Sequence, residues 1–213
     1  MANHDGAGDG NQHAVLALDA SRSMISLYGN QVFGGPNRVE IVARNLGSVL
    51  TELAGNVTIL YWALGLGDGI EIVGDFDKVT FSDAAITGPK TEKWGRGTCL
   101  LPTIRYIAET VDQHSQSTLG VVLTDGIIED EKECMEYCLQ LGENIKKAVD
   151  AGDRPKDSFQ IVMIGVGEDV DVGQLERFDD LFDDTPLAGE VDLFSSNLAA
   201  HMQDVNGAPL FEL

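Results

Sequence analysis

The order of apolar runs and helical stripes constrains the fold of this chain more than any other feature. Near-continuous apolar segments, typical of strands buried on both faces, occur at 14–19, 118–125 and 159–167. Segments with apolar residues at helical spacing lie between or beside them, at 38–54, 101–111 and 131–150. This alternation predicts an α/β fold with a mostly parallel sheet and helices on both faces.

A second pattern predicts one antiparallel strand at the edge of this sheet. The strand-like segments 56–64 and 70–76 are separated only by a turn-rich Gly-Leu-Gly-Asp-Gly stretch, which favours an antiparallel hairpin. Towards the end of the chain we expect a short helix near 173–182, a brief strand near 190–194 and a final helix near 196–205. The total is six strands.

The sequence shows neither an internal repeat nor a long linker, so we expect one domain over 13–205. Residues 1–12 and 206–213 are expected to form flexible tails. A hydrophobic content of 43% indicates a globular chain. No apolar run approaches the ~18 residues of a membrane span, and the first residues lack the positive and apolar regions of a secretory signal.

Charge and cysteine usage narrow the expected partners and location. The chain has 35 acidic and 14 basic residues, a net charge of −21, which disfavours nucleic acid and anionic membranes as partners. Cys134 and Cys138 are four residues apart on an apolar stripe, which favours buried thiols over a redox pair. With an odd number of cysteines and no signal segment, we expect a cytoplasmic location.

Polar residues follow two of the predicted strands at the point where each strand ends. Asp19 ends the first apolar run, with Ser21 and Ser23 at alternate positions after it, and Asp125 ends the run that begins at 118. Thr98 lies in a glycine-rich loop just before the 101–111 helix. Ligands of open α/β sheets bind beyond the carboxyl ends of the strands. These five hard oxygen donors therefore predict a site for Mg²⁺, with Mn²⁺ or Ca²⁺ as alternatives.

Three short motifs carry a resemblance to a known family. Asp-Ala-Ser-Arg-Ser followed by Met24, Gly-Arg-Gly-Thr at 95–98 and Leu-Thr-Asp-Gly at 123–126 stand in the order of the metal-ion-dependent adhesion site of von Willebrand factor A domains. The chain resembles this family over about residues 13–205. The resemblance implies a Rossmann-like, doubly wound sheet and a complete adhesion site.

The resemblance also implies how the site would work. Ser21 and Ser23 would bind the metal directly, and Thr98 directly or through water. Asp19 and Asp125 would act mostly through water or hydrogen bonds. The under-neutralised cation would then capture an aspartate or glutamate side chain of a protein partner. ATPase-associated and stress-response complexes are two settings that the resemblance leaves open.

The sequence departs from the common family pattern in two places. Arg22 stands where glycine is usual, and the 25–37 segment is longer than the usual connection. Tyr28, Phe33 and Trp94 either form a rim that touches a partner or pack against their own loops, and both interpretations stay open.

Two other classes of function are alternatives to a protein-binding domain. A phosphatase of the haloacid dehalogenase type starts with an aspartate at a strand end but needs a second carboxylate where this chain has Ser21. No nucleophile elbow, phosphate-binding loop or zinc-protease motif occurs. We therefore expect no enzyme activity, with a metal-dependent phosphoester hydrolase and a purely structural module of the same fold as the alternatives.

Overall fold

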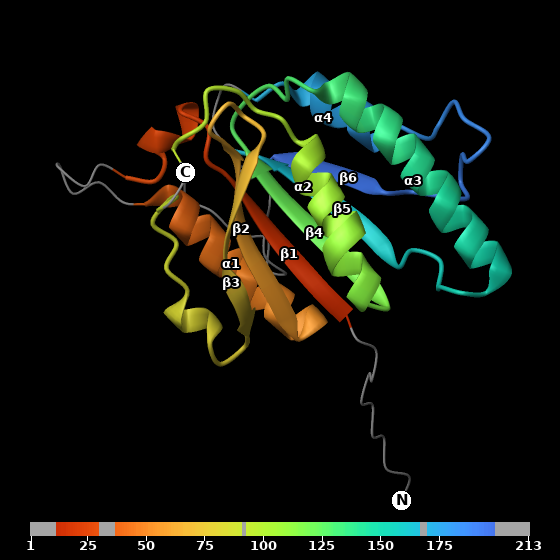
Figure 1. The fold of residues 1–213 in the computed structure, drawn as a ribbon, viewed down its shortest axis with the longest axis horizontal. Coiled ribbons are helices and arrows are strands. Elements are labelled where there is room, and N and C mark those ends of the chain that lie inside the picture. Colours follow the sequence, from red (N-terminus) through yellow and green to blue (C-terminus); the bar gives the residue numbers. More distant parts are fainter. Residues whose placement is uncertain (1–11, 30–36, 91–92, 167–169, 199–213) are drawn as a thin grey trace, which may run out of the picture.

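The computed structural model describes residues 12–29, 37–90, 93–166 and 170–198. Over these residues it contains six strands and four α-helices (Figure 1). The strands are β1 (Gln12–Asp19), β2 (Asn56–Leu64), β3 (Gly69–Asp77), β4 (Ser117–Thr124), β5 (Phe159–Gly165) and β6 (Phe194–Leu198). The helices are α1 (Arg38–Ala54), α2 (Leu101–Tyr106), α3 (Glu131–Ala151) and α4 (Val172–Asp179).

All six strands belong to one sheet, in the order β3-β2-β1-β4-β5-β6. Every neighbouring pair is parallel except β2 and β3, which form the antiparallel edge hairpin. The α/β fold with a six-stranded, mostly parallel sheet and one antiparallel edge strand is thereby confirmed. The parallel strands β1, β4 and β5 end at the same edge of the sheet, and the site is built at this carboxyl edge.

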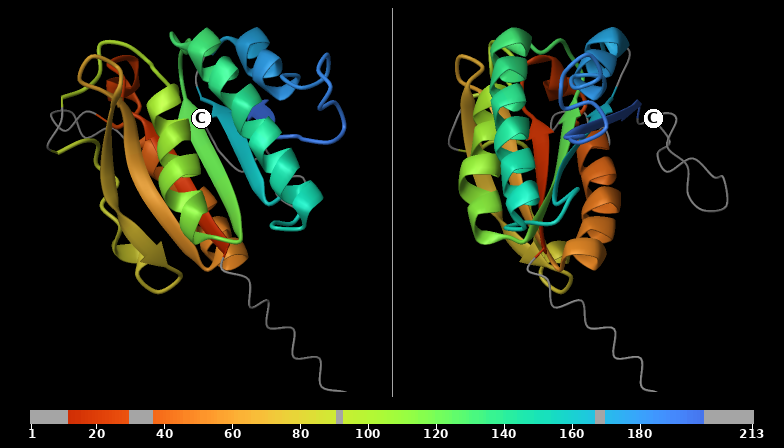
Figure 2. Two further views of the ribbon diagram at one scale, coloured as in Figure 1. Left: turned by 45° about the vertical axis from the view of Figure 1, so that its right-hand side comes forward. Right: turned by 90° about the vertical axis from the view of Figure 1, so that its right-hand side faces the viewer.

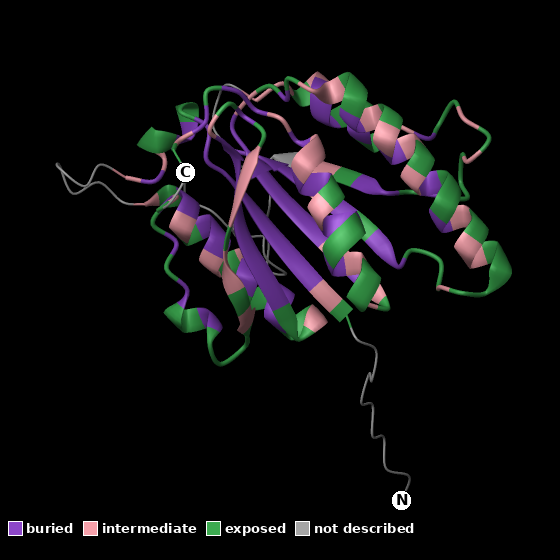
Figure 3. Cartoon of the chain, viewed as in Figure 1, coloured by how far each residue is buried: buried purple, intermediate pink, exposed green. Residues whose placement is uncertain are grey.

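Helices cover both faces of the sheet, as Figure 2 shows, with α1 on one side and α2 and α3 on the other. Strand β1 illustrates why its sequence is apolar throughout. Val15 and Ala17 belong to the core under α2 and α3, whereas Leu16 and Leu18 belong to the core under α1. The central strands are accordingly buried along most of their length (Figure 3). This double-sided burial holds the end of β1 in a fixed position.

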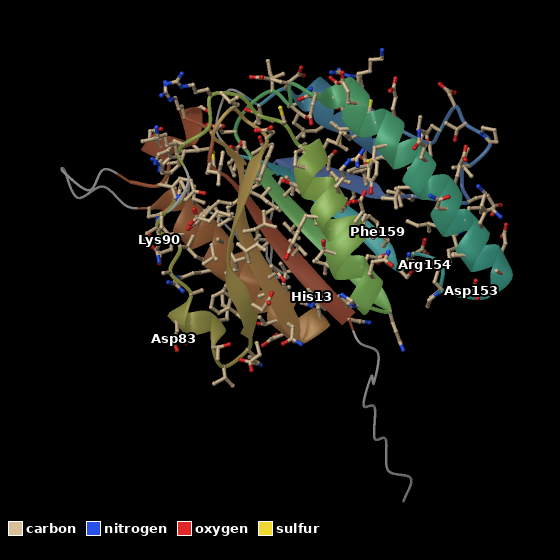
Figure 4. All side chains as sticks on the ribbon, in the orientation of Figure 1. His13, Asp83, Lys90, Asp153, Arg154 and Phe159 are labelled. Atoms are coloured by element: carbon tan, nitrogen blue, oxygen red, sulfur yellow. The ribbon has the colours of Figure 1, made fainter. Side chains whose placement is uncertain are left out.

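The opposite, amino edge of the sheet carries polar contacts of its own. His13, labelled in Figure 4, lies with its Nε2 atom 2.7 Å from Thr58 Oγ1. Arg154, also labelled, forms an ion pair of 2.9 Å with Asp112. These contacts lie at the far end of the strands from the predicted site.

Two expectations about the elements were wrong in detail. The helix expected over 101–111 is α-helical only to Tyr106 and continues as a π-turn over 107–111. The sixth strand occupies 194–198 rather than 190–194, so the helix expected from 196 does not begin there. The residues from Phe194 onward form a strand because they pair with β5. The spacing of apolar residues within 190–205 does not reveal this pairing, since β5 lies about thirty residues earlier in the chain. Residues 199–205 lie outside the described residues.

The two cysteines of α3 are placed as expected. Cys134 and Cys138 are fully buried in the core under this helix, and both are free thiols. None of the helices in the described residues combines the length and apolar character that crossing a membrane requires.

Candidate functional site

Asp19 is the most deeply buried member of the predicted set. It ends β1 with no exposed surface, and both of its carboxylate oxygens accept hydrogen bonds. Oδ1 accepts from the Ser21 amide at 2.7 Å, and Oδ2 accepts from the Thr124 hydroxyl at 2.8 Å. Burial raises the pKa of Asp19 to about 6; the hydrogen bonds from Ser21 and Thr124 oppose this rise, and the nearby charge of Asp125 adds to it.

The hydroxyls after β1 connect this carboxylate to the end of β4. Ser21 Oγ lies 2.9 Å from Ser23 Oγ, and Ser23 Oγ donates to Asp125 Oδ1 at 2.8 Å. Asp125 follows β4 directly and is buried. Hydrogen bonds therefore link Asp19, Ser21, Ser23 and Asp125 into one continuous network.

The glycine-rich loop before α2 is joined to the loop after β1 through the backbone. The Gly95 amide donates to the Ala20 carbonyl at 3.0 Å, and the Arg22 amide donates to the Gly95 carbonyl at 3.1 Å. A Cβ atom on Gly95 would lie 1.5 Å from the Ala63 carbonyl oxygen. Only glycine fits this approach. The contact brings Thr98 to the same place as the two serines.

The two loops and Glu129 line an open pocket of about 570 Å³ at the carboxyl edge of the sheet. Its lining consists of Ser21, Arg22, Ser23, Gly95, Arg96, Gly97, Thr98 and Glu129. Three of the predicted site residues thus line the pocket, whereas Asp19 and Asp125 are buried and do not line it. Arg96 and Glu129 were missed from the sequence, because a charged residue in a loop has no spacing that separates it from ordinary surface charge.

Two further polar residues were also missed, and both hold the loop after β4. The Asp130 carboxylate accepts from the amides of Leu100 and Leu101 at 2.7 and 2.9 Å, at the start of α2. The buried Gln174 side chain accepts from the Ile128 amide at 2.6 Å and donates to the Ile128 carbonyl at 2.8 Å. Their partners lie tens of residues away, so no local pattern could have identified them.

The aromatic residues near the site pack against their own loops. Tyr28 is buried, and its hydroxyl donates to the Asp19 carbonyl oxygen at 2.8 Å. The Tyr28 and Trp94 rings meet edge to face, with centroids 5.0 Å apart. Because Tyr28 is buried in this packing, it does not belong to a rim that touches a partner. Phe33 lies outside the described residues.

The polar groups of the network are engaged in hydrogen bonds inside the protein. Within the described residues, no group of three or more histidine, cysteine, aspartate or glutamate side chains could hold a metal ion. Both oxygens of Asp19 and the hydroxyl hydrogen of Ser23 are already used inside the protein. Hydrogen bonds thus engage the side-chain oxygens of Asp19, Ser21, Ser23 and Asp125.

Comparisons with known proteins identify a similar fold but no family. No protein-family model matches the chain, and no curated protein matches it in sequence. Among solved structures, proximal thread matrix protein 1 from the mussel byssus is similar, with 13% identity, a TM-score of 0.50 and coverage of 89% of this chain and 42% of that one. A mutant of the PilB minor pilin from Streptococcus sanguinis is similar with 14% identity, a TM-score of 0.50 and coverage of 90% and 58%.

A third solved structure, the pilus adhesin SpaC from Lactobacillus rhamnosus GG, has 14% identity, a TM-score of 0.49 and coverage of 89% of this chain and 29% of that one. This chain thus spans less than two thirds of the length of each of the three proteins. At such low identity the likeness concerns the fold alone.

These findings correct the family and function expected from the sequence. The similar structures with a TM-score of 0.50 are a thread matrix protein and a minor pilin, and neither a family match nor a metal-binding group among the described residues supports the resemblance. The assignment to von Willebrand factor A domains was wrong, and so was the cation-dependent adhesion function with its metal-binding description. The three motifs do converge in space, but they form a hydrogen-bonded network beside a pocket with two arginines.

Proposed function

We propose that this chain is a non-catalytic, protein-binding module of a structural or adhesive kind. Its recognition surface is the pocket lined by Ser21, Arg22, Ser23, Arg96 and Thr98, which we name the arginine pocket. The group recognised is a carboxylate from an aspartate or glutamate of a partner protein, bound directly by the arginines.

The two arginines carry this proposal. The chain has 35 acidic residues against 14 basic ones, so a basic side chain has many possible partners. Eight basic side chains elsewhere in the described residues do form ion pairs. Arg22 and Arg96 form none with any residue that the structure describes, although both line the same pocket.

The geometry of this pair suits an anion. Arg22 is hydrogen-bonded through its amide to Gly95, which directly precedes Arg96, so the two like charges belong to adjoining backbone segments. An anion that enters a pocket lined by two guanidinium groups is attracted by both of them. A guanidinium presents its N–H groups as a planar fork that matches a carboxylate, and the Thr98 hydroxyl adds a neutral donor. Glu129 also lines the pocket and opposes an acidic ligand, which makes binding weak and reversible.

The setting of the module is part of the proposal. A thread matrix protein and a minor pilin are the similar structures with a TM-score of 0.50, and their names support a structural or adhesive setting. These names favour a location outside the cell over the cytoplasm expected from the sequence. Nucleic acid and membranes remain disfavoured as partners, because the net charge of −21 repels both.

The sheet is proposed to be Rossmann-like and doubly wound. The chain runs outward from β1 to β3, returns to β4 and runs outward again to β6, so the strand order reverses between β1 and β4. Ligands of such sheets bind at the reversal point. The arginine pocket draws its lining from the loop after β1 and the loop before α2, with Glu129 from the loop after β4, which agrees with that rule.

Binding of the carboxylate by arginines needs no cation. The expected Mg²⁺, with Mn²⁺ or Ca²⁺ as alternatives, is untested and stays a prediction that calorimetric titration of the protein can check. The proposal expects the same peptide affinity in Mg²⁺ and in EDTA. A loss of peptide binding on chelation would contradict recognition by the arginines alone.

The test uses capped Gly-Gly-Glu-Gly and Gly-Gly-Gln-Gly peptides, with binding followed by NMR shifts of the Gly95 and Gly97 amides. Only the glutamate peptide should bind. Arg22→Gln and Arg96→Gln should each lower its affinity about fivefold, which corresponds to ~1 kcal/mol. Arg38→Gln is the matched control, because Arg38 is exposed and does not line the pocket.

The variant Glu129→Gln distinguishes a pocket that binds anions from one that binds cations. Removal of this negative charge should tighten binding of the glutamate peptide several-fold. The proposal is overturned if both arginine variants bind as the wild type does, or if Glu129→Gln weakens binding.

A further inference from the structure

Three large apolar side chains stand exposed on the loops that form or adjoin the arginine pocket. Leu66 is 81% exposed, Ile127 is 59% exposed and Ile25 is 44% exposed. Each comes from a different loop: Leu66 from the β2–β3 turn, Ile127 from the segment after β4, and Ile25 from the short helix Ser23–Ser26 after β1. Isolated exposed apolar residues are common on protein surfaces, and these three are distinguished by lying on loops that form or abut the pocket lining.

Backbone contacts and closeness in the sequence place these three residues next to the pocket lining. The Leu66 carbonyl oxygen would lie 2.9 Å from a Cβ atom on Gly97, so the tip of the β2–β3 turn abuts the lining. Ile25 follows Ser23 by two residues. Ile127 precedes Glu129 by two residues, and the Glu129 amide donates to the Thr98 carbonyl at 2.9 Å. We name Ile25, Leu66 and Ile127 the apolar rim.

We propose that the apolar rim selects a partner segment in which the acidic residue is flanked by large apolar side chains. This inference rests on the proposed function, since it assigns the surroundings of the carboxylate that the arginine pocket binds. The occupant is a protein segment, because it must supply one charge and apolar groups on both sides of it. The positive pair in the pocket and the apolar groups around it match that pattern in charge and in polarity.

The rim also affects the strength of the charged contact. Apolar side chains that close around a charged pair exclude water from it, and a pair shielded from water interacts more strongly than an exposed one. The neutral flanks of the ligand therefore increase affinity in two ways, by burying apolar surface and by shielding the arginine–carboxylate contact. Removal of the rim should leave the weak binding of an unflanked acidic peptide almost unchanged.

The experiment compares capped Leu-Phe-Glu-Leu with capped Gly-Gly-Glu-Gly on the full chain, by NMR titration. The flanked peptide should bind about tenfold more tightly, and Leu66→Ser and Ile127→Ser should each remove most of this advantage. Val79→Ser is the matched control. Val79 is also 81% exposed but follows the end of β3 at the other edge of the sheet. Thermal unfolding of each variant checks that the fold is retained.

The outcomes separate this inference from the proposed function. Equal affinity of the two glutamate peptides would overturn the rim inference and leave recognition of the carboxylate standing, whereas binding of neither would overturn both. Residues 210–213 of this chain read Leu-Phe-Glu-Leu as well. Glu212→Gln should leave the affinity of the flanked peptide unchanged. A several-fold rise would identify the chain's own segment as the occupant and overturn the assignment to a partner.

Discussion

The Thr124 hydroxyl donates a 2.8 Å hydrogen bond to Asp19 Oδ2 and thereby joins the ends of two neighbouring parallel strands. Both residues are fully buried. With this contact, Asp19 accepts two hydrogen bonds. Among the described residues it forms no ion pair with a basic side chain. A carboxylate in this position orders the loop after β1 at a cost in stability that depends on pH.

Asp19→Asn tests this dependence on pH. Because the pKa rises from 3.8 unfolded to about 6 folded, the folded state holds the proton more tightly, and stability is lost as pH rises through this window. The loss is about 3 kcal/mol at ~1.4 kcal/mol per pKa unit. Asn cannot titrate, so the variant should lack this slope and be more stable than the wild type above pH 6. Urea unfolding from pH 4 to 8 measures it.

The control for this experiment is Asp184→Asn, which changes an exposed carboxylate. It should keep the slope of the wild type. An Asp19→Asn variant with the slope unchanged would show that the buried carboxylate is not the titrating group.

Gly95→Ala tests the junction between the two loops of the arginine pocket. The added methyl group would lie 1.5 Å from the Ala63 carbonyl oxygen, so the backbone must move. Overpacking of this kind typically destabilises a protein by ~1–3 kcal/mol. We expect a lower melting temperature together with loss of binding of the flanked peptide.

Gly126→Ala is the matched control for that change, because a Cβ atom on Gly126 would meet nothing within 4 Å. Its melting temperature should stay near that of the wild type. An equal decrease in both variants would contradict the close approach seen at Gly95.

Gln174→Ala tests how the loop after β4 is held. The change removes both hydrogen bonds to the Ile128 backbone and leaves a buried amide and carbonyl without them. We expect a loss of ~2–6 kcal/mol, since each of the two unsatisfied buried groups costs about 1–3 kcal/mol. Hydrogen exchange at the Ile128 amide should speed up. Gln160→Ala, at an exposed position of β5, should affect neither quantity, and protection of Ile128 retained in Gln174→Ala would disprove the role.

The absence of enzyme activity is a prediction as well. Asp19 has no exposed surface, so a phosphoester cannot reach its carboxylate oxygens. We expect no hydrolysis of p-nitrophenyl phosphate above background with Mg²⁺ present. Turnover that Asp19→Asn abolishes would reject the non-catalytic assignment.

Local sequence determined the main elements of the fold. The boundaries of α1 and β2 follow directly from apolar spacing and from the asparagine that caps α1, whose side chain accepts from the Glu40 amide at 2.8 Å. The convergence of Asp19 and Asp125 also followed from sequence, because two apolar runs ending in carboxylates must meet at one edge of a parallel sheet.

Only the tertiary structure decided what these groups do together. Hydrogen bonds across 105 residues between Thr124 and Asp19, and across 102 residues between Ser23 and Asp125, use the oxygens that a motif alone suggests for a metal. The arginine pocket, the apolar rim and the pairing of β6 likewise depend on residues far apart in the chain. Motifs report which donors are present, whereas distances between distant segments decide whether those donors bind one another or an outside ligand.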